Sequence, residues 1–212
     1  MPTLTDYYQI IADLDLLART GVSYFGSPEH QFQLHPPLSE ADVCAFEAAY
    51  RIRLPEEYRM FLLHVGSGGA GPGYGLFTFH QMDDDDDMTR WEEGDGFVGV
   101  LARPFPYTDA WNNLTDQPDD EAMENEEEYE AQLDAFEARY YASLDGAIPL
   151  CHLGCALRQW LVVSGPEAGH IWADDRADYA GLSPLTTDGA DRVSFYDWYR
   201  GWLDAALAQV RA

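Results

Sequence analysis

Half of the acidic residues of this chain lie in two short segments, and this uneven distribution constrains the fold more than any other feature. Residues 83–95 contain eight acidic residues and one arginine, and residues 116–137 contain eleven acidic residues and no basic one. The whole chain has a formal net charge of −26, from 38 acidic and 12 basic residues. Runs of like charge repel one another and are normally solvated. We therefore predict a single domain over residues 1–212 with acidic insertions at about 80–97 and 116–143.

Periodic apolar residues predict helices at both ends of the chain. In the first of them, Ile10, Leu14 and Leu17 share one face and Gly21 ends the helix. Comparable stripes, with Ser39 and Ser194 as N-caps of two helices, mark the others. The predicted helices cover about residues 4–20, 39–52, 55–66, 119–143 and 194–210.

Short aromatic and β-branched runs between these helices predict strands. Residues 75–79 form one such run, bounded by glycine and by charge, and residues 160–172 read as a β-hairpin with a longer loop. Helices at both ends of a hairpin-rich middle predict an α+β fold, with a mostly antiparallel sheet flanked by N-terminal and C-terminal helices.

Charge and composition exclude several classes of function. A chain of this charge repels nucleic acid phosphates and anionic membrane surfaces, so we expect a neutral or basic partner, no nucleic acid and no membrane. All 12 basic residues are arginine, which excludes the phosphate-loop lysine, Schiff-base lysine and Ser-Lys nucleophile pairs. Three cysteines, no leader-like N-terminus and no long apolar run predict a cytoplasmic protein.

The glycine-rich run from Gly66 to Gly71 has the letters of the dinucleotide fingerprint G-x-G-x-x-G. That fingerprint needs a strand leading into a helix, whereas here a helix leads in and Pro72 and a strand follow. We therefore interpret the run as a turn whose glycines adopt positive φ, and we expect no nucleotide cofactor.

Two further runs contain residues that bind metal ions in other proteins. The aspartates at 83–87 have the alternate spacing of a calcium loop, but Met88 stands at the sixth position and Gly94 at the twelfth, so a solvated acidic loop is the better interpretation. Cys151, His152 and Cys155 lie close in sequence, and a zinc site would need a further ligand such as His170. We expect ordinary buried cysteines beside a strand, no metal, and no catalytic residues, although a Cys-His nucleophile pair is an alternative.

Ordered motifs at both ends of the chain resemble the SUKH (Smi/Knr-type) superfamily. The first is Leu-Pro-Glu-Glu-Tyr-Arg at 54–59, followed by Gly-Gly-Ala-Gly-Pro at 68–72. The second group includes Ile-Pro-Leu at 148–150, Gly-His-Ile-Trp at 169–172 and the aromatic helix from Phe195. The resemblance covers about residues 39–79 and 147–207.

The resemblance implies helices around a mostly antiparallel sheet and no catalytic residues. It also implies a role: bacterial members of the family are best known as immunity proteins that neutralise a toxin, and fungal members are regulatory interaction hubs. We therefore expect an immunity protein, not an enzyme, that binds a cognate and basic toxin domain acting on nucleic acid. The alternative is a regulatory protein-interaction module of the same fold without a toxin partner.

The acidic side chains of the two segments would then occupy the basic cleft of the toxin in place of substrate phosphates. The alternative interpretation is that both segments are only solubilising loops. The predicted partner-binding residues are Asp83, Asp84, Asp85, Asp86, Asp87, Glu92, Glu93, Glu126, Glu127 and Glu128.

Overall fold

Helices at both ends enclose a sheet-forming middle, which confirms the predicted α+β class. The structure, a computed structural model, describes residues 1–84, 87–94, 96–119 and 125–210, with the backbone alone at 82–84 and 87–89. The helices are α1 (Leu4–Thr20), α2 (Ser27–His30), α3 (Glu40–Tyr50), α4 (Glu56–His64), α5 (Glu126–Tyr140), the 3₁₀-helix η2 (Arg176–Asp178) and α6 (Phe195–Val210). The strands are β1 (Gln81–Asp84), β2 (Asp87–Arg90), β3 (Ala147–Gly154), β4 (Leu157–Val162), β5 (Ile171–Asp174) and β6 (Leu182–Pro184).

The main sheet has four antiparallel strands in the order β3-β4-β5-β6. Trp160 of β4 and Trp172 of β5 are register partners at its centre, and both side chains are buried. β1 and β2 form a separate two-stranded hairpin. The predicted hairpin at 160–172 is therefore confirmed as part of β4 and β5.

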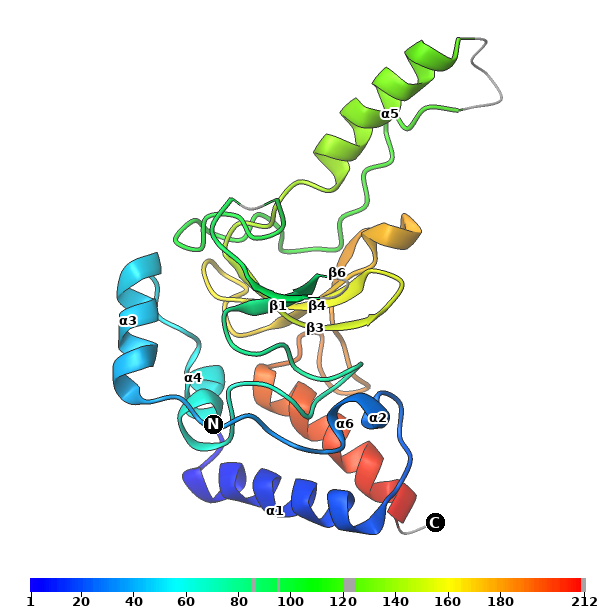
Figure 1. The fold of residues 1–212 in the computed structure, drawn as a ribbon. Helices are drawn as coiled ribbons and strands as arrows, with labels where there is room; N and C mark the ends of the chain where they lie inside the picture. Colours follow the sequence, from blue (N-terminus) through cyan, green and yellow to red (C-terminus); the bar gives the residue numbers. More distant parts are fainter. Residues whose placement is uncertain (85–86, 95, 120–124, 211–212) are drawn as a thin grey trace.

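Three helices form a layer on one side of this sheet. α1, α4 and α6 contact one another, and Figure 1 shows them on the side of the sheet opposite α5. Their contacts are largely aromatic: the ring of Phe61 lies 5.2 Å from that of Phe195 and 4.8 Å from that of Tyr199. The Tyr199 hydroxyl donates to the carbonyl of Ala70 at 2.8 Å, which ties α6 to the glycine-rich turn.

Three helix ends with a side-chain or glycine cap were placed correctly from the sequence. Ser39 accepts a hydrogen bond from the amide of Asp42 at 3.1 Å, and Ser194 accepts one from Asp197 at 3.2 Å. Gly21 ends α1 with φ 64°. These caps satisfy backbone groups that the helices leave open, so they fix the boundaries locally.

Several predicted boundaries were wrong. Pro55 is the N-cap of α4 and not its first residue, and α4 ends at His64, before Gly66. α5 ends at Tyr140, and residues 120–124 of its predicted start lie outside the described residues. Residues 75–79 form no full strand, because only Leu76 bridges to Cys151 of β3 while glycines around it turn the chain.

Candidate partner-binding surfaces

The run of aspartates at 83–87 forms part of a hairpin. Asp83 and Asp84 end β1, Asp87 begins β2, and Asp84 and Asp87 are register partners. Asp85 and Asp86 lie outside the described residues. The expected acidic loop is therefore wrong for the described part of this segment, which pairs as strands because the flanking residues at 81–82 and 88–90 extend the ladder.

Glu92 and Glu93 follow the hairpin, and both are exposed. Oε1 of Glu93 accepts a hydrogen bond from the amide of Leu101 at 2.8 Å. The Leu101 side chain is buried. Glu93 therefore supports the loop above the core, a role that does not require a partner.

Glu126, Glu127 and Glu128 form the exposed first turn of α5. The side chain of Asn125 caps this turn by accepting from the amides of Glu127 and Glu128, at 3.1 and 3.4 Å. Carboxylates at a helix N-terminus are favoured by the helix dipole. The Asn125 cap and the helix dipole therefore stabilise this start of α5, although no basic residue in the described part of the chain neutralises its three glutamates.

α5 presents an acidic surface away from the core. Figure 1 shows its N-terminal half projecting beyond the rest of the molecule, whereas Phe136 and Tyr140, near its C-terminal end, are buried. Its one basic residue, Arg139, pairs with Asp116 at 2.9 Å. Six acidic residues of the same helix therefore face no cation within it: Glu126, Glu127, Glu128, Glu130, Asp134 and Glu137.

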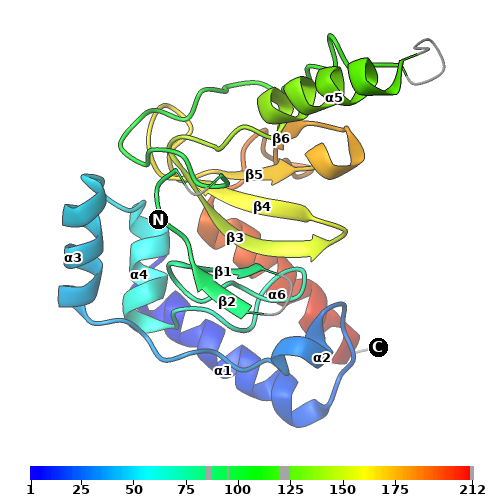
Figure 2. The same cartoon turned by 45° about the horizontal axis from the view of Figure 1, so that its top comes forward.

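The two acidic segments occupy different parts of the molecule. In Figures 1 and 2 the N-terminal end of α5 points away from the β1-β2 hairpin. In Figure 2 the hairpin lies near β3 and α5 lies near β6, at opposite edges of the four-stranded sheet. The predicted set of partner-binding residues therefore divides into two surfaces.

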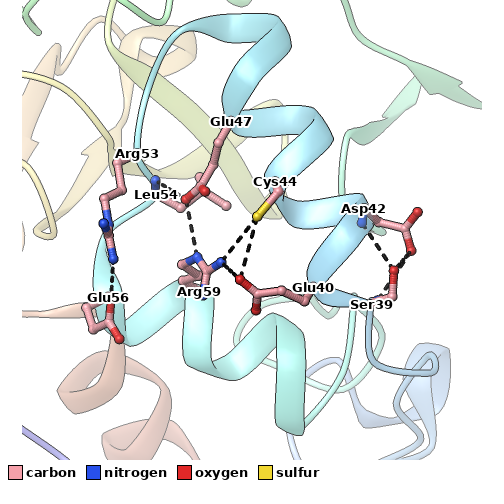
Figure 3. Close-up of polar contacts among 9 residues, drawn as sticks. All are labelled: Ser39, Glu40, Asp42, Cys44, Glu47, Arg53, Leu54, Glu56 and Arg59. Carbon is pink, nitrogen blue, oxygen red and sulfur yellow. Dashed lines mark hydrogen bonds and ion pairs between the residues drawn. The ribbon is translucent and has the colours of Figure 1, made fainter.

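The Leu-Pro-Glu-Glu-Tyr-Arg motif fastens α3 to α4, as Figure 3 shows. The Arg59 guanidinium contacts the carboxylate of Glu40 and lies 3.4 Å from Glu47. Glu47 also accepts from the amide of Leu54 at 3.0 Å. Arg59 lowers the pKa of Glu40 by hydrogen bonding to its carboxylate. The Cys44 thiol also lies 3.7 Å from Arg59. The motif therefore has a structural role, because it connects the two helices.

A groove of about 540 Å³ runs between α3 and the β1-β2 hairpin, with Phe46, Tyr50 and His80 among its lining residues. Arg90 donates from Nε to Nδ1 of His80 at 2.9 Å, so a neutral His80 carries its proton on Nε2 and donates to the Tyr50 hydroxyl, 2.7 Å away. Burial and the Arg90 charge lower the pKa of His80 to about 4. The imidazole thus stays neutral and holds the groove wall in place.

A second hollow, of about 340 Å³, lies at the base of α5 and was not identified from the sequence. Phe97, Tyr141 and Arg158 line it, and they come from a loop, a helix end and a strand. No periodic pattern connects positions so far apart in the chain, so only the folded structure brings them together.

The prediction that Cys151 and Cys155 are both buried is confirmed for Cys151 and wrong for Cys155. Cys151 is buried in β3, and burial raises the pKa of its thiol well above the ordinary value. Cys155 is exposed, because it occupies the tight turn between β3 and β4 with φ 51°. The ring of His152 stacks on that of Tyr74, with centroids 4.8 Å apart. Among the residues that the structure describes, no group of three His, Cys, Asp or Glu side chains could hold a metal ion.

The glycine-rich run turns the chain as predicted, although only two of its four glycines adopt positive φ. Gly68 and Gly69 have φ of 150° and 94°, and Gly69 bridges to both Leu34 and Leu76. A Cβ on Gly68 would lie 2.7 Å from the backbone of Thr78. These glycines are required where three backbone segments meet closely.

Comparison with known proteins connects this fold to one family. The family model described as SMI1 / KNR4 family (SUKH-1) matches residues 37–180. This range includes both acidic segments and ends before α6, whereas the resemblance in the sequence left out 80–146 and continued to 207. No curated protein and no solved structure gives a significant match. Within the described ranges, no helix has the length and apolarity needed to cross a membrane.

Proposed function

Because the chain belongs to the SMI1/KNR4 family (SUKH-1), we propose that it is an immunity protein that binds and neutralises a basic bacterial toxin domain. The toxin would act on nucleic acid, since a cleft that binds an anionic substrate is itself positive. We propose binding alone as the activity, with no catalytic step and no cofactor. The buried Cys151, with its raised pKa, is a poor nucleophile and supports this view.

The acidic face of α5 is the observation that carries the proposal. Its six carboxylates lie on one helix, whose N-terminal half projects from the body of the molecule, and the single arginine of that helix already pairs with Asp116. An uncompensated field of this kind attracts a basic surface over a distance of about 10 Å at 0.1 M salt. Electrostatic steering raises association rates toward about 10⁸–10⁹ M⁻¹s⁻¹.

Steering alone does not give tight binding. A nanomolar complex needs about −12 kcal/mol, and this energy comes chiefly from a desolvated centre of aromatic and arginine side chains. The acidic residues would therefore set the association rate and the orientation, and an apolar contact elsewhere on the same face would slow dissociation.

The test uses the protein encoded next to this one. We expect that protein to carry a basic domain that is toxic when expressed alone, and we expect coexpression of the present chain to restore growth. The purified pair should form a stoichiometric complex in which the activity of the domain is inhibited. A neighbouring protein that is bound but has no toxicity would favour the alternative, a regulatory interaction module. Absence of both binding and protection would contradict the proposal.

A further inference from the structure

Three large aromatic side chains are exposed near the base of α5. Phe97, Tyr141 and Tyr179 are 38%, 36% and 37% exposed, whereas large aromatic side chains are usually buried. Tyr141 and Tyr179 both lie beside Tyr140, with ring centroids 5.2 and 5.9 Å from it. Exposed aromatic residues that gather on one face typically mark a contact site for another protein.

The hollow of about 340 Å³ opens between two of these rings. Phe97 and Tyr141 line it, together with Arg158, whose guanidinium carbon lies 5.0 Å from the centre of the Phe97 ring. We call this hollow, with its lining residues Gly96, Phe97, Tyr141, Ala156, Arg158, Asp174, Arg176 and Ala177, the aromatic pocket. Its volume is at the lower end of the range of about 300–1,000 Å³ for binding sites, which suits one large side chain.

The floor of the aromatic pocket is rigid. Arg176 forms an ion pair with Asp174 at 2.7 Å, and its Nη1 also donates to the carbonyls of Tyr140 and Ala142 at 3.1 and 2.9 Å. The Tyr141 hydroxyl donates to the carbonyl of Arg176 at 3.1 Å. A site held in place before binding loses little conformational entropy when a partner arrives.

Carboxylates lie next to the lining of the aromatic pocket, and we call them its rim. Asp175 and Asp178 flank the lining residues Arg176 and Ala177, and no ion pair of either aspartate is found within the described part of the chain. Burial raises the pKa of Asp175, and the neighbouring Asp174 and Asp178 raise it further. Glu137 of α5 is close enough to raise the pKa of Tyr141. The acidic face of α5 therefore continues to this rim.

Charge selects the kind of occupant. A second copy of a chain with net charge −26 would bring like charges together at the rim, and an anionic membrane surface would be repelled in the same way. A basic protein surface instead relieves the repulsion among the rim carboxylates. The positive charge of Arg176 is matched by Asp174. The other cation of the lining, Arg158, lies over the electron-rich face of the Phe97 ring, which offsets part of its charge.

We propose that the aromatic pocket is the central contact for a basic partner protein. One apolar side chain of the partner enters between Phe97 and Tyr141, while its lysine or arginine residues face Asp175, Asp178 and Glu137. This inference rests on the proposed function and names the apolar centre that the acidic face of α5 requires.

The test is an NMR titration of the ¹⁵N-labelled full chain with the peptide Arg-Arg-Trp-Arg-Arg. We expect saturable shifts of the backbone amides at 96–97, 141, 156–158 and 174–177. The peptide with alanine in place of tryptophan should bind at least tenfold more weakly. Tyr141→Ala and the charged, space-filling Ala177→Arg should each weaken binding of the tryptophan peptide at least tenfold, because the first removes a wall and the second fills the pocket.

The matched control is Tyr8→Ala, which removes an aromatic side chain that is 52% exposed on α1 and should leave binding unchanged. Equal affinity of both peptides, or shifts confined to the groove beside α3, would overturn the inference. The proposed function is judged separately, by protection against the neighbouring toxin. If Ala177→Arg protects as well as the parent, the pocket inference is wrong and the proposed function stands. If the parent gives no protection, the proposed function fails whatever the peptide does.

Discussion

Arg176 and Asp174 form a two-point ion pair, 2.8 Å from Nε to Oδ1 and 2.7 Å from Nη2 to Oδ2, with both side chains about 8% exposed. Removing one partner leaves a buried charge without compensation, which costs about 3–5 kcal/mol. We therefore expect Arg176→Met to lower the free energy of unfolding by that amount in urea titrations followed by tryptophan fluorescence. Asp174→Asn added to Arg176→Met should recover part of the loss. A loss below about 1 kcal/mol for Arg176→Met would contradict the role of this pair.

Two glycines should respond in opposite ways to alanine. Gly69 has φ 94°, and an added Cβ would overlap the carbonyl oxygen of Gln33. Gly201, on the exposed side of α6, has nothing within 4 Å of such a Cβ. Gly69→Ala should therefore cost more than about 1 kcal/mol, whereas Gly201→Ala should stabilise by about 0.5–1 kcal/mol through helix propensity. The same denaturant titration measures both, and equal effects would show that the turn tolerates a side chain.

Sequence reasoning succeeded where structure is decided locally. The helix starts at Ser39 and Ser194 and the stop at Gly21 follow from hydrogen bonds and backbone angles within a few residues. The positive φ of Gly69 was predicted for the same kind of reason, since a helix ends before it and the chain must turn. The α+β class followed from the order of these elements.

What failed depends on strand pairing and on contacts between distant segments. The exposure of Cys155 is set by the length of β3 and β4, which places it in their turn. The described aspartates at 83–87 pair as a hairpin, although their charge predicts a loop. The aromatic pocket joins Phe97 of a loop, Tyr141 at the end of α5 and Arg158 of β4, which meet only in the folded chain.

His80 should make stability depend on pH in weakly acidic solution. Its pKa is lowered to about 4 by burial and by Arg90, whereas the ordinary value is 6.5. The unfolded chain therefore binds a proton more readily, and stability is lost as the pH falls from about 6.5 toward 4. Measured between pH 7 and 5, the free energy of unfolding should fall less steeply for His80→Asn than for the parent. Parallel profiles would show that His80 is not held neutral.

Asp175 should act in the opposite sense. Its folded-state pKa is raised, chiefly by burial and then by Asp174 and Asp178, so ionisation of Asp175 opposes folding. This penalty is absent below the ordinary pKa and grows as the pH rises through the raised one. Asp175→Asn should therefore be more stable than the parent at pH 7, and the two proteins should converge as the pH falls. A variant that is less stable than the parent at pH 7 would contradict the claim that the charge of Asp175 opposes folding.

The most direct test of the central claim is the rate at which the protein associates with its proposed partner, a basic toxin domain. We compare the parent with a variant that carries Glu126→Gln, Glu127→Gln and Glu128→Gln on α5. The control changes net charge equally at exposed positions elsewhere, with Glu29→Gln, Asp188→Asn and Asp191→Asn. In stopped flow at low salt, the α5 variant should associate about tenfold more slowly or worse, and the control should stay close to the parent.

The difference should vanish near 1 M salt, where the Debye length is about 3 Å, and dissociation should change little throughout. Equal association rates for the parent and the α5 variant at low salt would contradict the claim that this acidic helix guides a basic partner.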